Sequence, residues 1–400
     1  MIMMIRNKIY HLSLLLGLCL LVAGFLTSRI YRNFSVTDFI TIQKAQAAAG
    51  TWTNVTPSNA DLTDTLDCTN FGTISVAADP AHPSNLYSEF TCQGIWKSTD
   101  YGQTWTGPIN TGTNGSIAGD CAGGIALAPG SGSNPPTLYE ACIRGNAIGF
   151  WRSLDGGVSW TSYNIAPAAS NRQDVYPPVV DPYDGNHLIM AGHEQNLLVQ
   201  STDGGQIWTS INMASGMNQN GGTANLFFIN TGNASTTRNT WLYMAQGTGG
   251  TVGTWRTTNG GSSWTQVDTN EHPHGDGQIY QPDNNGVVYM AGIYSNLGWG
   301  VLRSTDYGQT WTHVGNTGSA AVVFGTPNNI YSDYSWACGN CTVDPGFQTA
   351  PQPGINGWAS MTTPSGMSMG PAQTATVFNG TNYIIIGADW LSGIWRYVEP

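Results

Sequence analysis

The sequence predicts an all-β protein, a single seven-bladed β-propeller of four-stranded blades whose ring is closed by the N-terminal strand. An eight-residue stretch recurs five times, and its final tryptophans stand 47 to 56 residues apart, near the length of one four-stranded blade. The chain has 51 glycines and 15 tryptophans but only 9% charged residues, which suits a turn-rich fold with a large core. The copies span residues 98–105, 153–160, 201–208, 257–264 and 304–311.

Each copy predicts a tight turn between two strands and reads Ser-x-Asp-x-Gly-x-Thr/Ser-Trp with small departures. The aspartate can accept hydrogen bonds from backbone N–H groups of its own turn, and the glycine supplies a positive φ without steric cost. In the fourth copy Asn259 replaces the aspartate. A turn that repeats around a fold is scaffold, so these aspartates are interpreted as structural rather than catalytic or metal-binding.

The repeat continues beyond the fifth copy, although the eight-residue stretch decays. Third strands keep opening with a glycine at a spacing of 46 to 47 residues, at Gly300, Gly346 and Gly393. The last blade is then one strand short. Residues 51–55 resemble residues 310–314, so the N-terminal strand is expected to complete that blade and to leave only short protected sheet edges. No helix is predicted.

Residues 1–49 are predicted to be a signal peptide, or an N-terminal anchor plus spacer, and residues 50–400 the propeller. Two basic residues precede an apolar run over residues 12–26, which is short for a membrane span and typical of an export signal. The A-x-A site at residues 45–47 lies far from this run, so an uncleaved anchor is the alternative. We expect a secreted monomer with no membrane insertion after processing.

Charge excludes several classes of partner. Residues 1–47 hold five basic residues and one acidic residue, so the rest of the chain has 8 basic and 23 acidic residues and a formal net charge of −15. Nucleic acid is a poor partner without a basic patch, and polyanionic glycans are disfavoured for the same reason. Five of the eight basic residues stand at or near one repeated strand position: Lys97, Arg152, Arg256, Arg303 and Arg396.

Six cysteines remain after export, an even number that is typical of disulfides in a secreted chain. Although fifteen pairings are possible, the expected pairs each fall within one repeat: Cys68–Cys92, Cys121–Cys142 and Cys338–Cys341. Metal binding by Cys338 and Cys341 is the alternative, but no second pair completes such a site. No cofactor is expected.

Function is expected on the face formed by the loops that lead into each first strand and the loops that join second to third strands. These loops vary in length and composition, whereas the repeated turns are short and regular. Aromatic rings flanked by Asn, Ser and Asp suit sugar recognition by stacking. Such rings occur in three consecutive blades, and the predicted substrate-binding rings are Tyr294, Trp299, Tyr334, Trp336 and Trp390. The alternative is that these rings only cap the blades.

The densest polar cluster lies in the loop that leads into blade 5. Asp276 is the preferred catalytic acid, because burial would raise the pKa of its carboxyl group, and Asp67 and Asp120 are candidates for the second carboxyl group of a glycosidase. His272 and His274 are candidate acid/base groups or metal ligands, but no third ligand is identifiable, so no metal site is predicted. Further substrate contacts are expected around the mouth of the channel, at Arg144, Arg172, Asp174 and Glu194, the last beside His193.

The repeated stretch, Ser-Thr-Asp-Tyr-Gly-Gln-Thr-Trp at residues 98–105, resembles the Asp-box, or BNR repeat, of sialidase-like β-propellers. The resemblance covers roughly residues 50–400. This part of the chain is similar to one propeller of the xyloglucanases, which are built from two propellers. That superfamily also includes sialidases, some polysaccharide lyases and non-catalytic receptors. A sialidase is not expected, because the Phe/Tyr-Arg-Ile-Pro motif and a set of three free arginines are missing. No catalytic aspartate is carried over from the xyloglucanases, because the second propeller of their cleft is absent.

The resemblance and the residues together lead to three hypotheses. The first is a secreted glycoside hydrolase that degrades a neutral or weakly charged polysaccharide or oligosaccharide. The second is a polysaccharide lyase with His272 or His274 as base, Tyr280 or Tyr294 as acid and an arginine that neutralises the uronate, which the net charge disfavours. The third is a non-catalytic carbohydrate-binding or cell-surface interaction module. The fold alone does not decide among them.

Overall fold

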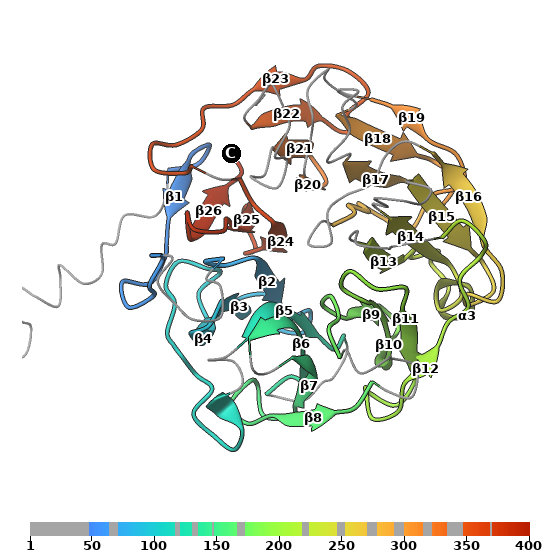
Figure 1. The fold of residues 1–400 in the computed structure, drawn as a ribbon. Coiled ribbons are helices and arrows are strands. Elements are labelled where there is room, and N and C mark those ends of the chain that lie inside the picture. Colours follow the sequence, from blue (N-terminus) through green and yellow to red (C-terminus); the bar gives the residue numbers. More distant parts are fainter. Residues whose placement is uncertain are drawn as a thin grey trace, which may run out of the picture. The chain divides into compact units, whose positions relative to one another are not determined.

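The computed structural model describes residues 48–63, 71–116, 121–129, 135–145, 148–165, 173–217, 224–245, 253–269, 278–291, 300–314, 322–333, 347–368 and 370–400. These residues form seven antiparallel sheets arranged as blades around a central axis (Figure 1). All seven sheets belong to one compact unit, Ala49–Pro400. The predicted all-β seven-bladed propeller is therefore confirmed.

The strands follow chain order within the first four blades, from the axis outward (Figure 1). Blade 1 holds β2 (Ser75–Ala78), β3 (Leu86–Phe90) and β4 (Gly94–Ser98). Blade 2 holds β5 (Cys121–Leu127), β6 (Leu138–Gly145), β7 (Gly149–Ser153) and β8 (Thr161–Tyr163). Blade 3 holds β9 (Val179–Asp181), β10 (Asp184–Ala191), β11 (Leu198–Ser201) and β12 (Thr209–Ser210). Blade 4 holds β13 (Ala224–Phe228), β14 (Trp241–Ala245), β15 (Gly253–Thr257) and β16 (Thr265–Asp268).

The remaining blades continue the pattern until the ring closes. Blade 5 holds β17 (Val288–Ala291), β18 (Val301–Ser304) and β19 (Thr312–His313). Blade 6 holds β20 (Val322–Gly325), β21 (Asn329–Asp333), β22 (Gln348–Pro351) and β23 (Ala359–Ser360). Blade 7 holds β24 (Gln373–Phe378), β25 (Tyr383–Ala388), β26 (Ile394–Val398) and, as its outermost strand, β1 (Trp52–Asn54).

The N-terminal strand closes the ring as predicted. β1 pairs with β26 in antiparallel register, with Trp52 opposite Tyr397. The Trp52 ring also packs at a centroid distance of 5.0 Å from Phe347 of blade 6 and 5.2 Å from Tyr397. Strand pairing and ring packing therefore fix both ends of the described chain in one blade.

Two blades and one turn differ from the simple repeat. In blade 1 the fourth strand is reduced to a bridge between Lys97 and Thr106, and in blade 5 the first strand is reduced to a bridge between Tyr280 and Tyr289. The expectation of no helix is wrong, because the described residues include a short helix, α3 (Ala234–Thr237). Its N-cap Asn233 accepts hydrogen bonds from two backbone N–H groups of the first turn. No helix among the described residues combines the length and apolar character needed to cross a bilayer.

The repeated turns have the hydrogen bonds that their sequence predicts. In blade 1, Asp100 Oδ1 accepts from the Thr104 backbone N–H at 2.9 Å, and Ser98 Oγ accepts from the Gly102 N–H at 2.9 Å. Burial alone would raise the pKa of the Asp100 carboxyl group, but hydrogen bonds from Thr104 and Ser98 more than offset it and the pKa is lowered. The boxes of blades 2, 3 and 5 have the same arrangement, so these aspartates are structural anions of the turn.

Removing one such anion tests the scaffold role. Asp155→Ala is expected to lower the free energy of unfolding by about 1–2 kcal/mol, because the hydrogen bonds from Ser153, Val158 and Ser159 to its Oδ1 atom are lost. Asp155→Asn is the matched control, since the natural Asn259 accepts the equivalent bonds in blade 4. Urea unfolding measures both variants, and equal losses in the two would contradict this account.

Three of the five basic residues at the repeated strand position form hydrogen bonds between neighbouring blades. Arg152 of blade 2 donates to the backbone oxygen of Gly204 in the blade 3 turn at 3.0 Å, and Arg256 of blade 4 donates to the oxygen of Tyr307 in blade 5 at 2.7 Å. Arg396 of blade 7 closes the circle by donating to the Tyr101 oxygen of blade 1 at 2.9 Å. These three guanidinium groups are thus occupied by hydrogen bonds to the repeated turns.

Candidate functional site

Most of the predicted site residues lie outside the described residues and stay predictions: Asp67, Asp120, Arg172, His272, His274, Asp276, Tyr294, Trp299, Tyr334 and Trp336. Arg144 lies at the loop end of β6, where its backbone stands opposite Ala122 of β5. Asp174, Glu194 and Trp390 are described with their side chains. The structure brings the first two together and separates the third from them.

Asp174 and His193 form an ion-pair-like dyad on the loop face of blade 3. Asp174 precedes β9 and His193 follows β10, so both stand at the end of the blade where loops lead into the first strand and out of the second. His193 Nδ1 lies 3.0 Å from Asp174 Oδ2, and both residues are buried at 6% exposure. An ionised carboxylate only accepts hydrogen bonds, so His193 donates from Nδ1 and its Nε2 atom is left for other partners.

The backbone holds the dyad in place. A bridge between Val175 and Gly192 extends the pairing of β9 and β10. The backbone N–H of His193 donates to the backbone oxygen of Asp174 at 3.0 Å. The side-chain amide of Gln195 donates to the same oxygen. Between them Glu194 takes a φ of 53°, which turns its side chain away from the strand direction. The pairing of β9 and β10 is therefore what sets the geometry of the dyad.

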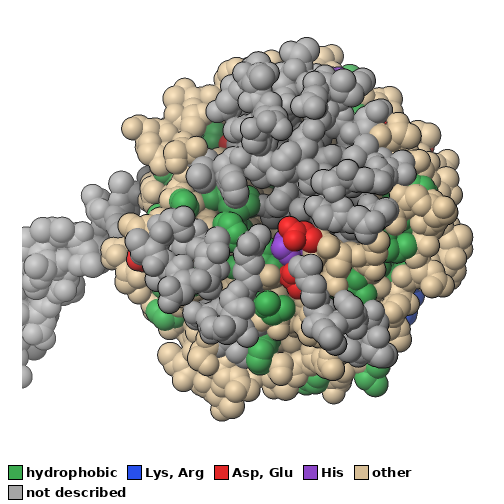
Figure 2. Space-filling view, in the orientation of Figure 1, with side chains coloured by type: hydrophobic (Ala, Val, Ile, Leu, Met, Phe, Trp, Pro, Cys, Tyr) green, Lys and Arg blue, Asp and Glu red, His purple; other side chains and the backbone are tan. Residues whose placement is uncertain are grey.

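Glu194 extends the dyad toward solvent. Its Oε1 atom lies 3.8 Å from His193 Nε2, and its side chain is 45% exposed. The Tyr176 ring packs edge-on against the His193 imidazole at a centroid distance of 5.2 Å. Figure 2 shows acidic and histidine side chains gathered near the centre of one face of the ring. The arrangement provides an accessible carboxyl group backed by a histidine and a second, buried carboxyl group.

A small cavity borders the same region on the inner side of Tyr176. Its walls come from blades 2, 3, 4 and 7 and are mostly apolar, with two side-chain amides: Ile125, Tyr176, Pro177, Met190, Asn225 and Gln373 are among them. None of the described residues that line it carries a charged side chain. A ligand seated there would meet apolar surface and amides, which suits a neutral polar molecule.

Trp390 does not have the exposure expected of a stacking platform. The ring is only 3% exposed and meets Phe71 edge-on at a centroid distance of 6.3 Å. The Trp390 backbone also exchanges two hydrogen bonds with Thr73, which precedes the first strand of blade 1. The expected exposure of this ring is wrong, because residues of the neighbouring blade 1 pack against the indole at the seam between blades 7 and 1. Its predicted role in substrate binding stays a prediction.

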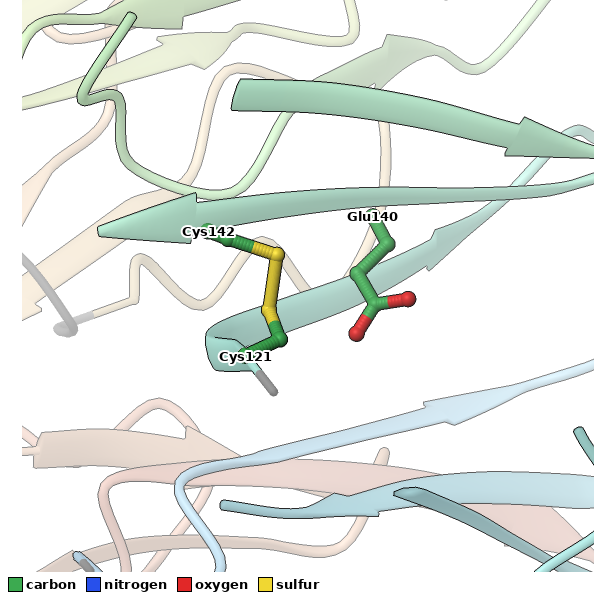
Figure 3. Close-up of side chains that lie close together, drawn as sticks. All are labelled: Cys121, Glu140 and Cys142. Atoms are coloured by element: carbon green, nitrogen blue, oxygen red, sulfur yellow. A yellow bond between two sulfur atoms is a disulfide. The ribbon is translucent and has the colours of Figure 1, made fainter. Parts of the chain in front are cut away.

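The structure also tests metal binding by cysteine. Among the described residues, Cys121, Glu140 and Cys142 bring potential ligand atoms within 4.8 Å of one another (Figure 3). The two sulfur atoms are joined in a disulfide, so no thiolate is available to a metal ion. The predicted Cys121–Cys142 pair is thereby confirmed. Cys92 is disulfide-bonded as well, while Cys68, Cys338 and Cys341 lie outside the described residues.

Comparison with known proteins supports the fold. A scan against protein-family models finds no match, and a search of curated proteins finds none. Among solved structures, YCF48 from Cyanidioschyzon merolae is 12% identical, with a TM-score of 0.52 over 87% of this chain and 98% of that chain. A structure of YCF48 bound to D1 peptide is 15% identical, with a TM-score of 0.50 over 87% and 97%. An ancestral GH74 enzyme is 16% identical, with a TM-score of 0.51 over 87% of this chain but 48% of its own length.

The chain is a seven-bladed β-propeller that resembles YCF48 and GH74 enzymes at low identity. It spans nearly all of YCF48 and about half of the GH74 enzyme. At these identities the likeness shows the fold alone. The two neighbours differ in kind, since one carries the designation of an enzyme and the other is seen with a bound peptide.

Sequence reasoning missed the roles of His193 and Tyr176. His193 was noted only as the neighbour of Glu194, and Tyr176 was not singled out. A signal was present in the blade geometry, because the residue just before a first strand and the residue just after a second strand meet at one end of the same blade. Applied to blade 3, this pairing rule would have joined Asp174 to His193 across 19 positions of sequence.

Proposed function

We propose that the protein is a secreted glycoside hydrolase that cleaves a neutral or weakly charged polysaccharide on the loop face of the propeller. The observation that carries the proposal is the series Asp174, His193 and Glu194, in which an accessible carboxyl group is backed by a buried Asp–His dyad. Glycosidic cleavage needs a carboxyl group that transfers a proton at the bridging oxygen. Glu194 is the described group with the exposure to reach that oxygen.

The other two members are positioning residues in this proposal. His193 Nε2 faces the Glu194 carboxyl group at 3.8 Å, and Asp174 fixes the imidazole through Nδ1 at 3.0 Å. The pair thereby limits the orientations of the Glu194 carboxyl group. The second carboxyl group that a hydrolase requires is proposed to come from Asp276, Asp67 or Asp120.

The charges of the described residues support a neutral substrate. Arg152, Arg256 and Arg396 are committed to turn carbonyls, and Lys97 and Arg303 lie over the tyrosine rings of their own blades. The described residues that line the cavity beside Tyr176 carry no charge. A uronate would need a cation to neutralise its carboxylate, so neutral sugars fit these groups better.

Export is part of the proposal. The Cys121–Cys142 disulfide and the disulfide-bonded Cys92 suit an oxidising compartment, and residues 12–26 have the apolar character of an export signal. The aromatic loops with Tyr294, Trp299, Tyr334 and Trp336 are proposed to hold the polysaccharide chain by stacking.

A binding function is the second candidate, favoured by the likeness to YCF48, which this chain covers over 98% of its length and which is also seen with a bound peptide. In that case the loop face would hold a ligand without transforming it. Propellers carry either kind of site, so an assay has to separate the two.

The purified protein incubated with neutral and uronate-containing polysaccharides is expected to release new reducing ends from a neutral glycan without new ultraviolet absorbance. New absorbance from unsaturated uronates would replace hydrolysis by a lyase mechanism. No products from any glycan, together with retention on insoluble glycan or on immobilised peptide, would replace the enzyme by a binding module.

A further inference from the structure

The small cavity beside Tyr176 lies on the axis of the ring. Its described lining includes residues from the innermost strands of four blades: Ile125 of β5, Val179 of β9, Phe227 of β13 and Gln373 of β24. Blade 7 has blades 6 and 1 as its neighbours and lies across the ring from blades 3 and 4 (Figure 1). One space can touch all four blades only where the innermost strands meet, so the cavity belongs to the central channel.

The cavity adjoins the series Asp174, His193 and Glu194. Tyr176 borders the cavity and also packs edge-on against the His193 imidazole at a centroid distance of 5.2 Å. Ala191 borders the cavity as well, and its backbone oxygen accepts a hydrogen bond from the Tyr176 N–H at 2.9 Å. Glu194 follows Ala191 by three positions in the chain. The carboxyl group proposed to transfer a proton therefore lies beside the entrance to the channel.

A side-chain amide crosses the other side of the channel. The Gln278 amide nitrogen donates to Thr374 Oγ1 of β24 at 2.8 Å and to the backbone oxygen of Val323 in β20 at 3.2 Å. The Gln278 Oε1 atom accepts from the Thr374 backbone N–H at 2.9 Å. Since Gln278 leads into blade 5, this one side chain joins the inner strands of blades 5, 6 and 7. The cavity lies toward blades 2, 3 and 4, beside this crossing.

The size of the cavity limits what it can hold. Its volume is about 80 Å³, measured as the space open to the centre of a water molecule. One water molecule needs roughly 10–15 Å³ on this measure. The cavity therefore has room for several water molecules or one small ring, and it is too small for a polymer segment of several sugars. A polysaccharide can enter it only by a chain end.

The lining combines apolar faces with side-chain amides. Ile125, Pro177 and Phe227 offer apolar surface to the C–H face of a sugar ring. Gln373 and Asn225 bring amide groups, which contain both donors and an acceptor and so match the hydroxyl groups of a sugar. None of the described lining residues is charged. A uronate or an amino sugar would therefore lose water around its charge without gaining a partner.

We propose that the channel cavity binds one neutral sugar ring and holds the terminal residue of the polysaccharide, so that cleavage takes place at a chain end. Binding of a single sugar stands on the cavity alone, whereas the chain-end role rests on the proposed hydrolase function. In that role the bond between the anomeric carbon and the bridging oxygen breaks, and Glu194 gives its proton to that oxygen. Water supplies the hydroxyl group that the anomeric carbon takes up and the proton that restores Glu194.

Titration of the purified protein with glucose, galactose, mannose, xylose and glucuronate tests the binding site without any need for catalysis. At least one of the four neutral sugars is expected to bind with a Kd on the order of 1 mM, because so small a ligand gives weak affinity, and glucuronate is expected not to bind. Gln373→Met keeps the length of the side chain but removes the amide, so it is expected to weaken binding about tenfold. Gln200→Met, at a partly buried glutamine of β11 outside the cavity, is the matched control and is expected to keep the wild-type affinity.

The products of glycan cleavage test the chain-end role. One short product is expected from the earliest time points, while the viscosity of the polymer falls slowly. Random chain lengths and a fast fall in viscosity would overturn the chain-end role but keep the hydrolase. No neutral sugar bound by the wild type, or equal affinities in Gln373→Met and the wild type, would overturn the binding site. Sugar binding that is weakened in Gln373→Met, in a protein that cleaves no glycan, would support the site and remove the hydrolase.

Discussion

Glu194→Gln is expected to lower kcat for glycan cleavage by about 10²- to 10⁴-fold with little change in stability, because an amide cannot transfer the proton and the side chain is 45% exposed. The expectation rests on the hydrolase proposal. The measurement is the rate of reducing-end release from the best neutral glycan, with urea unfolding of the same preparation to confirm the fold.

A matched control lies at the other end of the same strand. Asp184 begins β10, whereas Glu194 follows its end, so the two carboxyl groups stand on opposite faces of blade 3. Asp184→Asn is expected to keep the wild-type kcat. Full activity in a folded Glu194→Gln protein would move the acid to Asp276 or another loop carboxyl group, while equal losses in both variants would indicate damage to the blade rather than loss of a proton donor.

The positioning role of His193 has its own readout. His193→Gln is expected to shift the pH profile of kcat/KM in addition to lowering the rate, because the imidazole facing Glu194 Oε1 at 3.8 Å is lost. His82 provides the matched control, since its Nδ1 atom also lies 3.0 Å from an aspartate, Asp79, in an exposed turn of blade 1. His82→Gln is expected to change neither the rate nor the profile.

The sequence predicted those parts of the fold that depend on local chemistry. The box turn needs only an acceptor, a hydroxyl group and a glycine within eight residues. In blade 1 these are Asp100, Ser98 and Gly102, and the same turn forms wherever the pattern recurs. The count of seven blades followed from a regular period, and closure by β1 followed from the missing strand. In each case the information lies within one repeat or in its spacing.

What the sequence could not provide is contact between blades. The box residue Gly102 of blade 1 lies close to Ile386 of blade 7, and Arg396 of blade 7 donates to the Tyr101 backbone oxygen in the same turn. Trp390 was expected to be exposed because it follows an acidic residue in a loop, and only the position of Phe71 shows that it is covered. These contacts depend on how neighbouring sheets twist against each other, and no pattern within one repeat records that.

The candidate site falls between these two cases. Asp174 and Glu194 were selected because polar residues collect on the loop face, and the structure places both beside His193. The sequence did not show that Asp174 is buried and Glu194 exposed, because this depends on the bridge between Val175 and Gly192 and on the Tyr176 ring. The residue types were thus accessible from the sequence, whereas their roles required the geometry.

Glu399, the residue that follows β26, is where a substitution is expected to have the largest effect on stability. Glu399 is 2% exposed and receives four hydrogen bonds from blade 6 at 2.7–2.8 Å. The donors are Thr326, Asn328, Asn329 and Tyr331. Burial, and then the hydrogen bond to Glu399, raise the pKa of Tyr331 and keep its hydroxyl group a donor. This carboxylate therefore ties the last strand of the chain to the preceding blade.

Glu399→Ala is expected to lower the free energy of unfolding by about 3–5 kcal/mol, because four donors, of which Thr326 and Tyr331 are buried, lose a charged acceptor at once. Glu399→Gln is expected to lose less, since its amide oxygen still accepts while its NH₂ group faces donors. Urea unfolding measures both, with Glu194→Ala as the control at an exposed glutamate that is expected to stay within about 0.5 kcal/mol of the wild type. A loss below about 1 kcal/mol in Glu399→Ala would contradict the proposed role of Glu399 in joining blade 7 to blade 6. The β1–β26 pairing would then be the main closure of the ring.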